Sequence, residues 1–301
     1  MDIQILLWLQ NLRNPVFNAI NFAITLLADE AVLLVLLCGM YWCWSKRNAA
    51  FLAFNFFAGM VVNSFLKITC CVPRPWVRDA RIVPYGDAIE SATGYSFPSG
   101  HTACGTAVYG GFALLAKKKW LSWAMVILAV LIGFSRMYLG VHTPQDVLVS
   151  LAVGFALLFA VRKGLDEIEK RPGLDVRVLL GGLVLAAALA LYAGLKPYPA
   201  DATPELIEDT YKTAGALMGM LLGWFMERRF VKFDEKAVIF WQIVKVIGGI
   251  AGILAVKALL KPVFVAVAGD AVGGMLRYCL MVLWAIWLWP ALFVRFAKPK
   301  A

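Results

Sequence analysis

Long apolar segments recur along this chain of 301 residues, and they limit its possible folds more than any other feature of the sequence. Hydrophobic residues make up 61% of the composition and charged residues only 16%, a mixture far from that of soluble domains. A segment of about 20 apolar residues crosses a bilayer as a helix, because a helix satisfies its own backbone hydrogen bonds in hydrocarbon. We therefore predict an all-α, polytopic bundle of membrane helices.

The apolar segments divide the chain into three predicted regions. Residues 1–28 hold an amphipathic interfacial helix and a short apolar helix that ends near Ala28. Residues 29–165 form a core of five or six transmembrane helices, with crossings expected near 30–45, 48–67, 101–116, 121–138 and 146–161. Residues 166–301 add about four transmembrane helices, near 174–194, 211–226, 237–260 and 271–294.

The distribution of basic residues sets the expected orientation. Three basic clusters lie on the same side of the predicted bundle: Lys46-Arg47, Lys117-Lys118-Lys119 and the stretch 162–171. The positive-inside rule assigns this side to the cytoplasm, so the loop 68–98 and the turn 139–145 face the other side. This topology accounts for the formal charge of +10, and we expect no nucleic-acid partner.

Only two histidines occur in the chain, and both fall at the predicted outer ends of helices. His142 precedes Thr143 and Pro144, a typical helix N-cap and first helical residue, which puts Asp146 in the first turn. A carboxylate at that place orients the imidazole and leaves its other nitrogen free for nucleophilic attack. Asp146 is also suited to a capping box with Thr143, and the two roles are compatible.

His101 ends the segment Pro98-Ser99-Gly100-His101, directly before an apolar helix. Ser99 is suited to the N-cap, so the free amides that follow would point at an anion placed there. Gly100 has no side chain, which leaves room for a phosphate to approach the backbone. The alternative for Ser99 is a role as a helix cap alone.

Three cations accompany the histidines on the predicted outer side, which normally carries fewer of them: Lys67, Arg74 and Arg136. Basic residues at the ends of membrane helices often extend their side chains to the lipid headgroups. Fixed positive charge also stabilises the negative charge of a phosphoryl group during its transfer. No carboxylate cluster or cysteine framework suited to a metal accompanies these cations. We expect a phosphoryl site with no metal and no cofactor.

In this order, the three segments resemble the type 2 phosphatidic acid phosphatase superfamily, which also contains the vanadium haloperoxidases. The superfamily pattern is K-x6-R-P, then P-S-G-H, then S-R-x5-H-x3-D. The chain matches every defined position: Lys67, Arg74, Pro75, Pro98 to His101, Ser135, Arg136, His142 and Asp146. The resemblance covers about residues 15 to 165 and does not account for the C-terminal helices.

The resemblance implies catalytic roles for three residues: His142 attacks phosphorus, Asp146 orients it, and His101 protonates the leaving group. It implies that five others bind the phosphoryl oxygens: Lys67, Arg74, Ser99, Gly100 and Arg136. The expected function is hydrolysis of a lipid phosphate or diphosphate, of the undecaprenyl diphosphate, phosphatidic acid or phosphatidylglycerol phosphate type. The expected partners are this lipid and the bilayer, and the expected place is the non-cytoplasmic face of a bacterial plasma membrane.

Two other functions fit the same residues. A lipid phosphotransferase uses the same site and differs only in passing the phosphate to an acceptor other than water. A lipid carrier or scaffold would use the C-terminal helices, 174–294, to bind or move lipid. A haloperoxidase shares the anion pocket, but the apolar segments argue against it.

Three ionisable residues lie inside the predicted C-terminal crossings: Lys245, Lys257 and Arg277. Such residues often mark functional sites, and reaching from a helix end toward the membrane surface is the competing explanation. We assign no role to them from the sequence.

Overall fold

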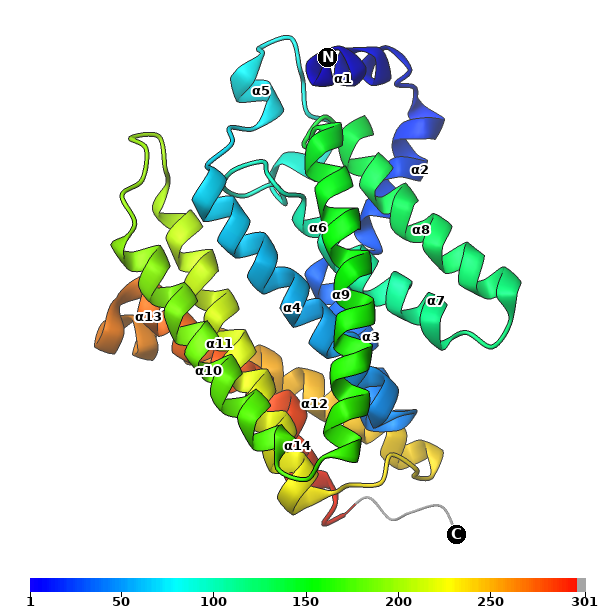
Figure 1. The fold of residues 1–301 in the computed structure, drawn as a ribbon, viewed down its shortest axis with the longest axis vertical. Coiled ribbons are helices and arrows are strands. Elements are labelled where there is room, and N and C mark those ends of the chain that lie inside the picture. Colours follow the sequence, from blue (N-terminus) through cyan, green and yellow to red (C-terminus); the bar gives the residue numbers. More distant parts are fainter. Residues whose placement is uncertain (297–301) are drawn as a thin grey trace. The chain divides into compact units, whose positions relative to one another are not determined.

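The structure is a computed structural model that describes residues 1–296, and these residues form helices and no strand (Figure 1). The first half contains α1 (Asp2–Asn11), α2 (Pro15–Leu26), α3 (Glu30–Cys43), α4 (Lys46–Cys70), α5 (Pro75–Arg78), the 3-10 helix η1 (Gly86–Ile89), α6 (Gly100–Gly105), the π-helix η2 (Thr106–Gly110), α7 (Gly111–Leu115), α8 (Lys119–Tyr138) and α9 (Pro144–Lys170). The second half contains α10 (Leu174–Leu195), α11 (Pro204–Met226), the π-helix η3 (Glu227–Val231), α12 (Ile239–Leu259), α13 (Lys261–Leu283), the π-helix η4 (Trp284–Leu288) and α14 (Trp289–Phe293). The predicted all-α membrane bundle is confirmed.

Among residues 1–296, six helices are long and apolar enough to cross a membrane, or up to seven spans if α2 and α3, bent by 47° at their junction, count as one. This is fewer than the nine crossings predicted above. The segment predicted at 101–116 is one continuous helix made of α6, η2 and α7, but its residues (6 in α6, 5 in η2 and 5 in α7) are fewer than the about 20 that a crossing needs. The segment predicted at 211–226 is the second part of α11, whose first part carries Glu208 and Asp209. The apolar part of each of these two segments is shorter than the apolar part of the six spans.

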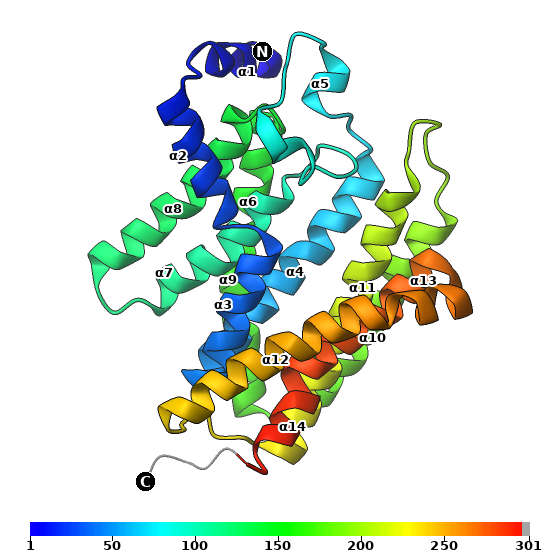
Figure 2. The same cartoon turned by 180° about the vertical axis from the view of Figure 1, so that it is seen from behind.

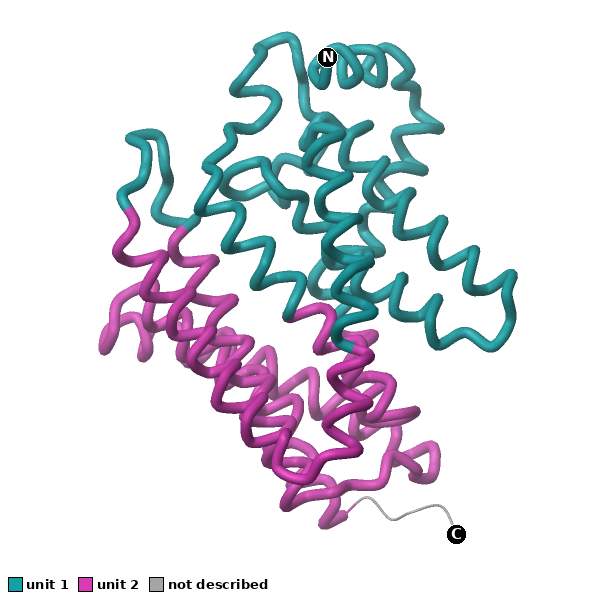
Figure 3. Tube along the Cα trace, viewed as in Figure 1, with its two compact units in different colours: residues 1–33, 58–161, 197–206 teal, residues 34–57, 162–196, 207–301 magenta. Residues whose placement is uncertain are grey.

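The chain folds as two compact units, shown in teal and magenta in Figure 3. Unit 1 contains residues 1–33, 58–161 and 197–206. Unit 2 contains residues 34–57, 162–196 and the described residues from 207 onward. The division into functional regions at 28 and 165 stays a prediction, because packing units and functional regions are different divisions of a chain.

Small residues bring the helices of unit 1 together. Helix α8 packs on α2 and on the continuous helix made of α6, η2 and α7 (Figure 2). A Cβ atom added to Gly133 of α8 would lie 2.6 Å from Val147 of α9, and one added to Gly154 of α9 would lie 2.6 Å from Thr106. These contacts fix the helices that carry the second and third sequence motifs.

The predicted interfacial helix α1 braces the loop between the first and second motifs. Gln10 donates from Nε2 to the carbonyl of Arg81 at 3.1 Å and accepts from the amide of Val83 at 2.9 Å. Arg13 donates to the carbonyl of Val83 at 2.6 Å and, through Nε and Nη2, to the carbonyl of Tyr138 at 3.2 and 2.9 Å. Arg13 therefore joins this loop to the end of α8.

The turn after α8 requires a glycine. Gly140 has φ +80°, and a Cβ atom there would lie 2.9 Å from Nη2 of Arg13. Only glycine adopts that backbone conformation without strain, and here it also leaves room for the guanidinium. The turn brings the chain to His142 two residues later.

In unit 2, α11 and α13 approach each other along a row of glycines. A Cβ atom on Gly215 would lie 2.0 Å from the carbonyl oxygen of Met275, and one on Gly219 would lie 2.4 Å from that of Cys279. Without side chains at these positions the two backbones come into contact, which is a common way for membrane helices to associate. Helix α13 is itself broken at Gly269, where φ is +74°.

Two of the three ionisable residues noted in the C-terminal crossings, Lys245 and Arg277, form hydrogen bonds within unit 2. Lys245 donates to the carbonyls of Trp42 at 3.2 Å and Glu235 at 3.0 Å. Arg277 donates to the carbonyl of Lys257 at 3.1 Å, near the end of α12. Both side chains satisfy carbonyl groups, several of which a helix leaves without a partner at its C-terminal end.

Candidate active site

The first motif lies at the end of α4 and in the segment that follows it. Lys67 is in the last turn of α4, and Cys71, with φ +47°, ends the helix. The chain then becomes extended and Arg74 occupies the N-cap of α5, with Pro75 as the first helical residue. A proline suits that position because its fixed φ matches the helix and it needs no amide hydrogen bond.

Arg74 is buried and ties the first motif to the third. Its Nε donates to the carbonyl of Gly94 at 2.9 Å and its Nη2 to that of Thr93 at 2.6 Å. Its Nη1 donates to the carbonyl of Val141 at 3.1 Å and lies 3.0 Å from Nε2 of His142. A guanidinium has only donors, so Nε2 of His142 must be the acceptor in this contact.

The contact with Arg74 fixes the protonation of His142. Because Nε2 accepts a hydrogen bond, the proton of the neutral ring lies on Nδ1, which is 3.4 Å from Oδ2 of Asp146. Burial and the positive charge of Arg74 hold the pKa of His142 well below its usual 6.5, and they outweigh the opposing effect of Asp146. At neutral pH the ring is therefore uncharged, with its lone pair on the nitrogen that is not directed at Asp146.

Asp146 is held in place by two short hydrogen bonds. Its Oδ2 accepts from the hydroxyl of Ser96 at 2.6 Å and from the amide of Thr143 at 2.7 Å. Thr143 returns the contact through its hydroxyl, which accepts from the amide of Asp146 at 3.4 Å. The capping box and the 3.4 Å contact of Asp146 with His142 thus exist together, and the orienting role of Asp146 stays a prediction.

Ser96 was not singled out in the sequence. It is fully buried, and its amide donates to the carbonyl of Val72 at 2.7 Å, two residues before Arg74. It therefore joins the first motif to Asp146 of the third. Its place two residues before Pro98 is the one signal that would have drawn attention to it, since its partner Asp146 lies 50 positions further along the chain.

The second motif begins the helix formed by α6, η2 and α7. Ser99 caps α6: its hydroxyl accepts from the amide of Thr102 at 3.4 Å and from the Thr102 hydroxyl at 2.8 Å. Ser99 is fully buried. The structure therefore shows Ser99 as a helix cap, the alternative role considered for it above. Its predicted contact with a phosphoryl oxygen stays a prediction. Gly100 is the first helical residue, at the place predicted for it.

The three predicted cations lie around His101. Lys67, Arg74 and Arg136 are all within electrostatic range of its imidazole, which is half-buried in the first turn of α6. Arg136 is fully buried and donates to the hydroxyls of Thr25 at 2.9 Å and Ser91 at 3.2 Å, and its Nε has no hydrogen-bond partner among the described residues. A buried donor without a partner calls for an explanation, such as a catalytic role or a bound water or ion.

The structure thus brings the side chains of all three motifs into one region of unit 1 and leaves their chemical roles to be proposed. Direct contacts join Arg74, His142 and Asp146. The residues that support them came from outside the motifs: Ser96, Thr25, Ser91, Thr93 and Gly94. Among residues 1–296 no three His, Cys, Asp or Glu side chains gather as metal ligands would.

The fold and this group of residues define an integral membrane protein that presents a neutral histidine, its carboxylate partner and several cations. The chain belongs to the PAP2 superfamily, whose family model matches residues 48–169. A second family model, described as a transmembrane extension of PAP2 superfamily phosphatases, matches residues 211–300. The C-terminal helices, which the sequence motifs do not account for, therefore have a counterpart within the same superfamily.

Several curated proteins are similar to this chain. An undecaprenyl-diphosphatase of Bacillus subtilis is 31% identical over 172 residues, which is 55% of this chain and 84% of the relative. A phosphatidylglycerophosphatase B of Bacillus subtilis is 31% identical over 173 residues, 53% of this chain and 80% of the relative. A lipid A 4'-phosphatase of Bacteroides thetaiotaomicron is 27% identical over 164 residues, 51% of this chain and 72% of the relative. No solved structure matches the chain.

The prediction of a membrane phosphatase of this superfamily is confirmed by the family models and the relatives together. The three relatives are named for three different lipid phosphates.

Proposed function

We propose that this phosphatase hydrolyses a lipid phosphate or diphosphate through a phosphohistidine formed on Nε2 of His142. The observation that carries the proposal is the series of contacts Arg74, His142, Asp146 and Ser96. Nε2 of the neutral imidazole directs its lone pair toward Arg74, Nδ1 lies 3.4 Å from Asp146, and Ser96 donates a hydrogen bond to Asp146. The substrates that fit are undecaprenyl diphosphate, phosphatidic acid and phosphatidylglycerol phosphate. The names of two relatives, an undecaprenyl-diphosphatase and a phosphatidylglycerophosphatase, support the first and the third of these.

Binding of the substrate exchanges the partner of Arg74. Phosphoryl oxygens accept hydrogen bonds from an arginine more strongly than a neutral imidazole does, because the bond is charge-assisted at both ends. Nη1 therefore turns from Nε2 of His142 to a phosphoryl oxygen, and the lone pair of Nε2 becomes free to attack. Lys67, Gly100 and Arg136 bind the other oxygens, and Nε of Arg136, which has no hydrogen-bond partner among the described residues, donates to one of them.

The chemistry proceeds in two steps. Burial and the neighbouring cations lower the pKa of His101 to about 3 in the free site, and the negative charge of the bound phosphate raises it so that His101 takes up a proton from solvent. Nε2 of His142 then forms a bond to phosphorus as the bond between phosphorus and the leaving oxygen breaks, and protonated His101 gives that oxygen its proton. Asp146 stabilises the positive charge on the imidazole ring through Nδ1. In the second step His101 takes a proton from water, the hydroxide oxygen bonds to phosphorus, and the bond to Nε2 breaks to release phosphate.

Phosphate release from detergent-solubilised protein tests the function, with chelator present throughout. We expect the wild type to hydrolyse at least one of the three lipid substrates and His142→Ala and Asp146→Asn to lose activity by about a thousandfold or more, as removal of a nucleophile or its orienting group does elsewhere. Leu148→Ala, at an exposed position of α9, is the control and should retain wild-type activity. Release unchanged in His142→Ala would exclude the proposed nucleophile.

The covalent intermediate needs its own experiment. Protein mixed with a lipid labelled in its phosphate and stopped in alkali should carry label that acid removes, the behaviour of a phosphorus–nitrogen bond. His101→Gln should slow both steps, and His142→Ala should carry no label. Label that survives acid would indicate an ester and a different nucleophile.

We further propose that the site faces away from the cytoplasm of a bacterial plasma membrane. Cys70, at the exposed end of α4 beside the first motif, is a natural reporter. In a protein whose other cysteines are replaced, a membrane-impermeant maleimide should label Cys70 in intact cells. A cysteine placed at Lys118 instead should react only after the cells are opened, and the reverse pattern would invert the proposed topology.

A further inference from the structure

Residues 93–96, which precede the second sequence motif, hold two side chains of the candidate site. Two carbonyls of this segment accept hydrogen bonds from Arg74 at 2.6 and 2.9 Å. The hydroxyl of Ser96 donates to Asp146 at 2.6 Å. The place of this segment therefore sets the places of the arginine and the carboxylate that contact the two ring nitrogens of His142.

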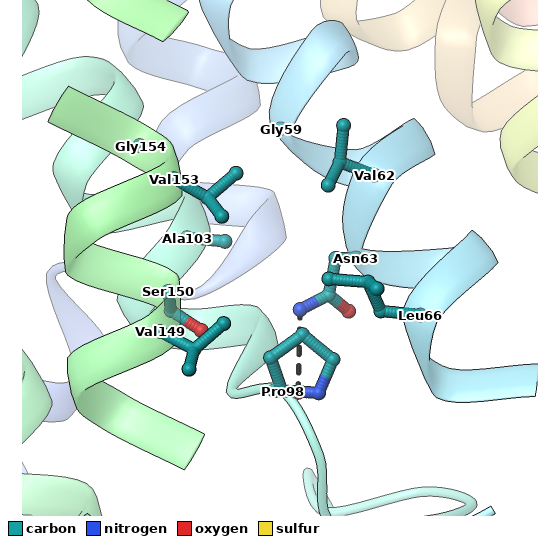
Figure 4. A pocket seen from close by; sticks show the side chains of 10 residues that line it. All are labelled: Gly59, Val62, Asn63, Leu66, Pro98, Ala103, Val149, Ser150, Val153 and Gly154. Atoms are coloured by element: carbon teal, nitrogen blue, oxygen red, sulfur yellow. Dashed lines mark hydrogen bonds between the residues drawn. The ribbon is translucent and has the colours of Figure 1, made fainter. Parts of the chain in front are cut away.

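Helices α4 and α9 fix the chain that follows this segment. Asn63 on α4 donates to the carbonyl of Pro98 at 3.2 Å, and Figure 4 draws this hydrogen bond as a dashed line. Ser150 on α9 donates to the carbonyl of Ser99 at 2.9 Å. Both bonds lie beyond residue 96, so residues 94 and 95 need other contacts to hold them in place.

A loop from the second half of the chain, residues 197–206, supplies such contacts. It leads from α10 into the first turn of α11 and belongs to unit 1 (Figure 3). The amide of Ala202 donates to the carbonyl of Pro199 at 3.0 Å, which closes a turn that contains Asp201. The loop lies between the stretches matched by the two family models, so neither match includes it.

This turn brings Asp201 to Tyr95. Tyr95 is buried, and its hydroxyl donates to Oδ1 of Asp201 at 3.1 Å. Burial and this hydrogen bond raise the pKa of Tyr95 to about 12, so the phenol keeps its proton at neutral pH and remains the donor. The bond joins the loop to the residue directly before Ser96.

Leu206 packs against Gly94, the residue before Tyr95. Leu206 is only 3% exposed, and a Cβ atom added to Gly94 would lie 3.1 Å from its Cδ1. The same Cβ atom would lie 3.9 Å from Cδ of Lys67, so the loop and one of the predicted cations both border Gly94. The loop therefore contacts two successive residues of the segment that holds the candidate site.

We propose that Tyr95, Asp201 and Leu206 are positioning residues for the phosphatase reaction. They act through residues 93–96, whose carbonyls and serine hold the groups that contact His142. The inference rests on the proposed phosphohistidine mechanism and adds to it a contribution from the loop between α10 and α11. A displacement of about 1 Å caused far from the reacting atoms can cost about a hundredfold in rate, so a modest shift of this segment is enough to slow the reaction.

The hydrogen bond can be removed from either end. Tyr95→Phe removes the donor, Asp201→Ala removes the acceptor, and the double variant removes both. We expect each single variant to lower kcat by about tenfold, the effect of losing a hydrogen bond to a charged group. The double variant should lose no more than the slower single variant, because both substitutions remove the same contact.

Tyr85→Phe is the matched control, since it removes a hydroxyl from an exposed tyrosine of the loop 68–98. It should keep the wild-type kcat. Leu206→Ala should lower kcat as well, whereas Leu195→Ala, at a position that is 73% exposed, should not. All rates are measured well below the thermal unfolding temperature of each variant, so that loss of folded protein does not contribute.

A second measurement reports on the site without turnover. In His101→Gln protein labelled with ¹⁵N-histidine, every histidine signal comes from His142, because the chain has two histidines. Nε2 of His142 accepts a hydrogen bond from Arg74, so a displaced arginine changes the Nε2 resonance. Tyr95→Phe should move this resonance, and Tyr85→Phe should leave it in place.

Three results would overturn the proposal: a wild-type kcat in both Tyr95→Phe and Asp201→Ala, losses that multiply in the double variant, or an Nε2 resonance that does not respond to Tyr95→Phe. A wild type that hydrolyses no lipid would instead overturn the proposed function. The resonance of His142 would then decide the positioning role by itself.

Discussion

At the scale of single residues, Arg74 connects the parts of the candidate site. Its guanidinium has three carbonyl partners and one imidazole partner, drawn from residues 93, 94, 141 and 142. The carbonyl contacts hold the side chain at a fixed place, while the imidazole contact sets which nitrogen of His142 carries the proton. One buried cation thus determines both the geometry and the protonation of the proposed nucleophile.

The charge of His142 can be measured directly, because the chain has only two histidines. In His101→Gln protein labelled with ¹⁵N-histidine, NMR reports His142 alone. The pKa of His142 lies well below 6.5, so we expect a neutral ring protonated on Nδ1 when the pH falls through 6.5. The groups that face the ring are Arg74 and Arg136, which lower its pKa, and Asp146, which raises it.

A second variant tests whether Arg74 lowers the pKa of His142. Arg74→Gln removes the nearer cation, so the pKa of His142 should rise and the protonated ring should persist to higher pH than in the parent protein. The control is Arg81→Gln, whose guanidinium is exposed and pairs with Asp79. A His142 signal that titrates identically with and without Arg74 would contradict the role we assign to this arginine.

Ser96 offers a test of positioning at the same scale. Ser96→Ala removes the 2.6 Å hydrogen bond to Asp146, and a bond to a charged group contributes about 1.5–3 kcal/mol. We expect kcat to fall by about tenfold to a hundredfold with a much smaller change in KM, because the carboxylate no longer holds the imidazole in line. Ser122→Ala, far along α8, should leave both constants unchanged. Equal effects of the two variants would show that Ser96 has no special function.

The motif residues could be predicted from the sequence, and the residues that support them could not. Spacing along the chain predicts that His142 and Asp146 share a helix end, because that contact is local. The contacts of Asp146 with Ser96 and of Arg136 with Thr25 join positions 50 and 111 residues apart. Such contacts depend on how the helices pack, and no periodicity of the sequence encodes them.

At the scale of helices, the pattern of apolar residues predicts where most elements lie and misses where they bend. Helices α8, α9, α10 and α12 agree closely with the crossings expected from hydropathy. The 47° bend between α2 and α3 and the break of α13 at Gly269 were not predicted. Hydropathy measures the affinity of a segment for lipid, whereas bends arise from backbone geometry at one or two residues.

The close approach of α11 and α13 gives the prediction at this scale. Gly215→Ala would place a methyl group 2.0 Å from the carbonyl oxygen of Met275, and a backbone atom cannot move aside as a side chain can. We expect a loss of about 1–3 kcal/mol in stability, the usual cost of overpacking. The measurement is the thermal unfolding temperature of the detergent-solubilised protein.

Gly181→Ala is the matched control, because a Cβ atom at this helical glycine has nothing within 4 Å. There the better helix propensity of alanine should raise stability slightly, by up to about 1 kcal/mol. The two substitutions are chemically identical, so opposite signs isolate the contact between α11 and α13. A stabilising Gly215→Ala would contradict the close packing.

At the scale of the whole molecule, the units interleave along the chain. Unit 2 contains residues 34–57 together with the C-terminal helices, so the start of α4 belongs to it and the end of α4 to unit 1. Within unit 2, Trp42 donates to the carbonyl of Ala285 at 2.8 Å, and Lys46 forms an ion pair with Glu227 at 2.9 Å. The helices matched by the transmembrane extension are thus packing partners of α3 and α4.

This arrangement predicts the result of truncation. A chain that ends at residue 165 leaves residues 34–57 without these partners, so we expect aggregated protein without phosphatase activity. The chain of 301 residues is the folded, active reference. Size-exclusion chromatography in detergent and the phosphate-release assay check both. A folded, active fragment 1–165 would show that the C-terminal helices are an independent attachment.

The hydrogen bond between Arg74 and His142 has a consequence for the enzyme at rest. In the proposed mechanism, the lone pair on Nε2 of His142 is unavailable for attack until a phosphoryl group replaces the imidazole as a partner of Arg74. Electrophiles that carry no anionic oxygens do not compete with His142 for Arg74, so they leave the lone pair of Nε2 bound. The substrate itself therefore activates the proposed nucleophile. Without substrate, the imidazole does not react with other electrophiles in the membrane.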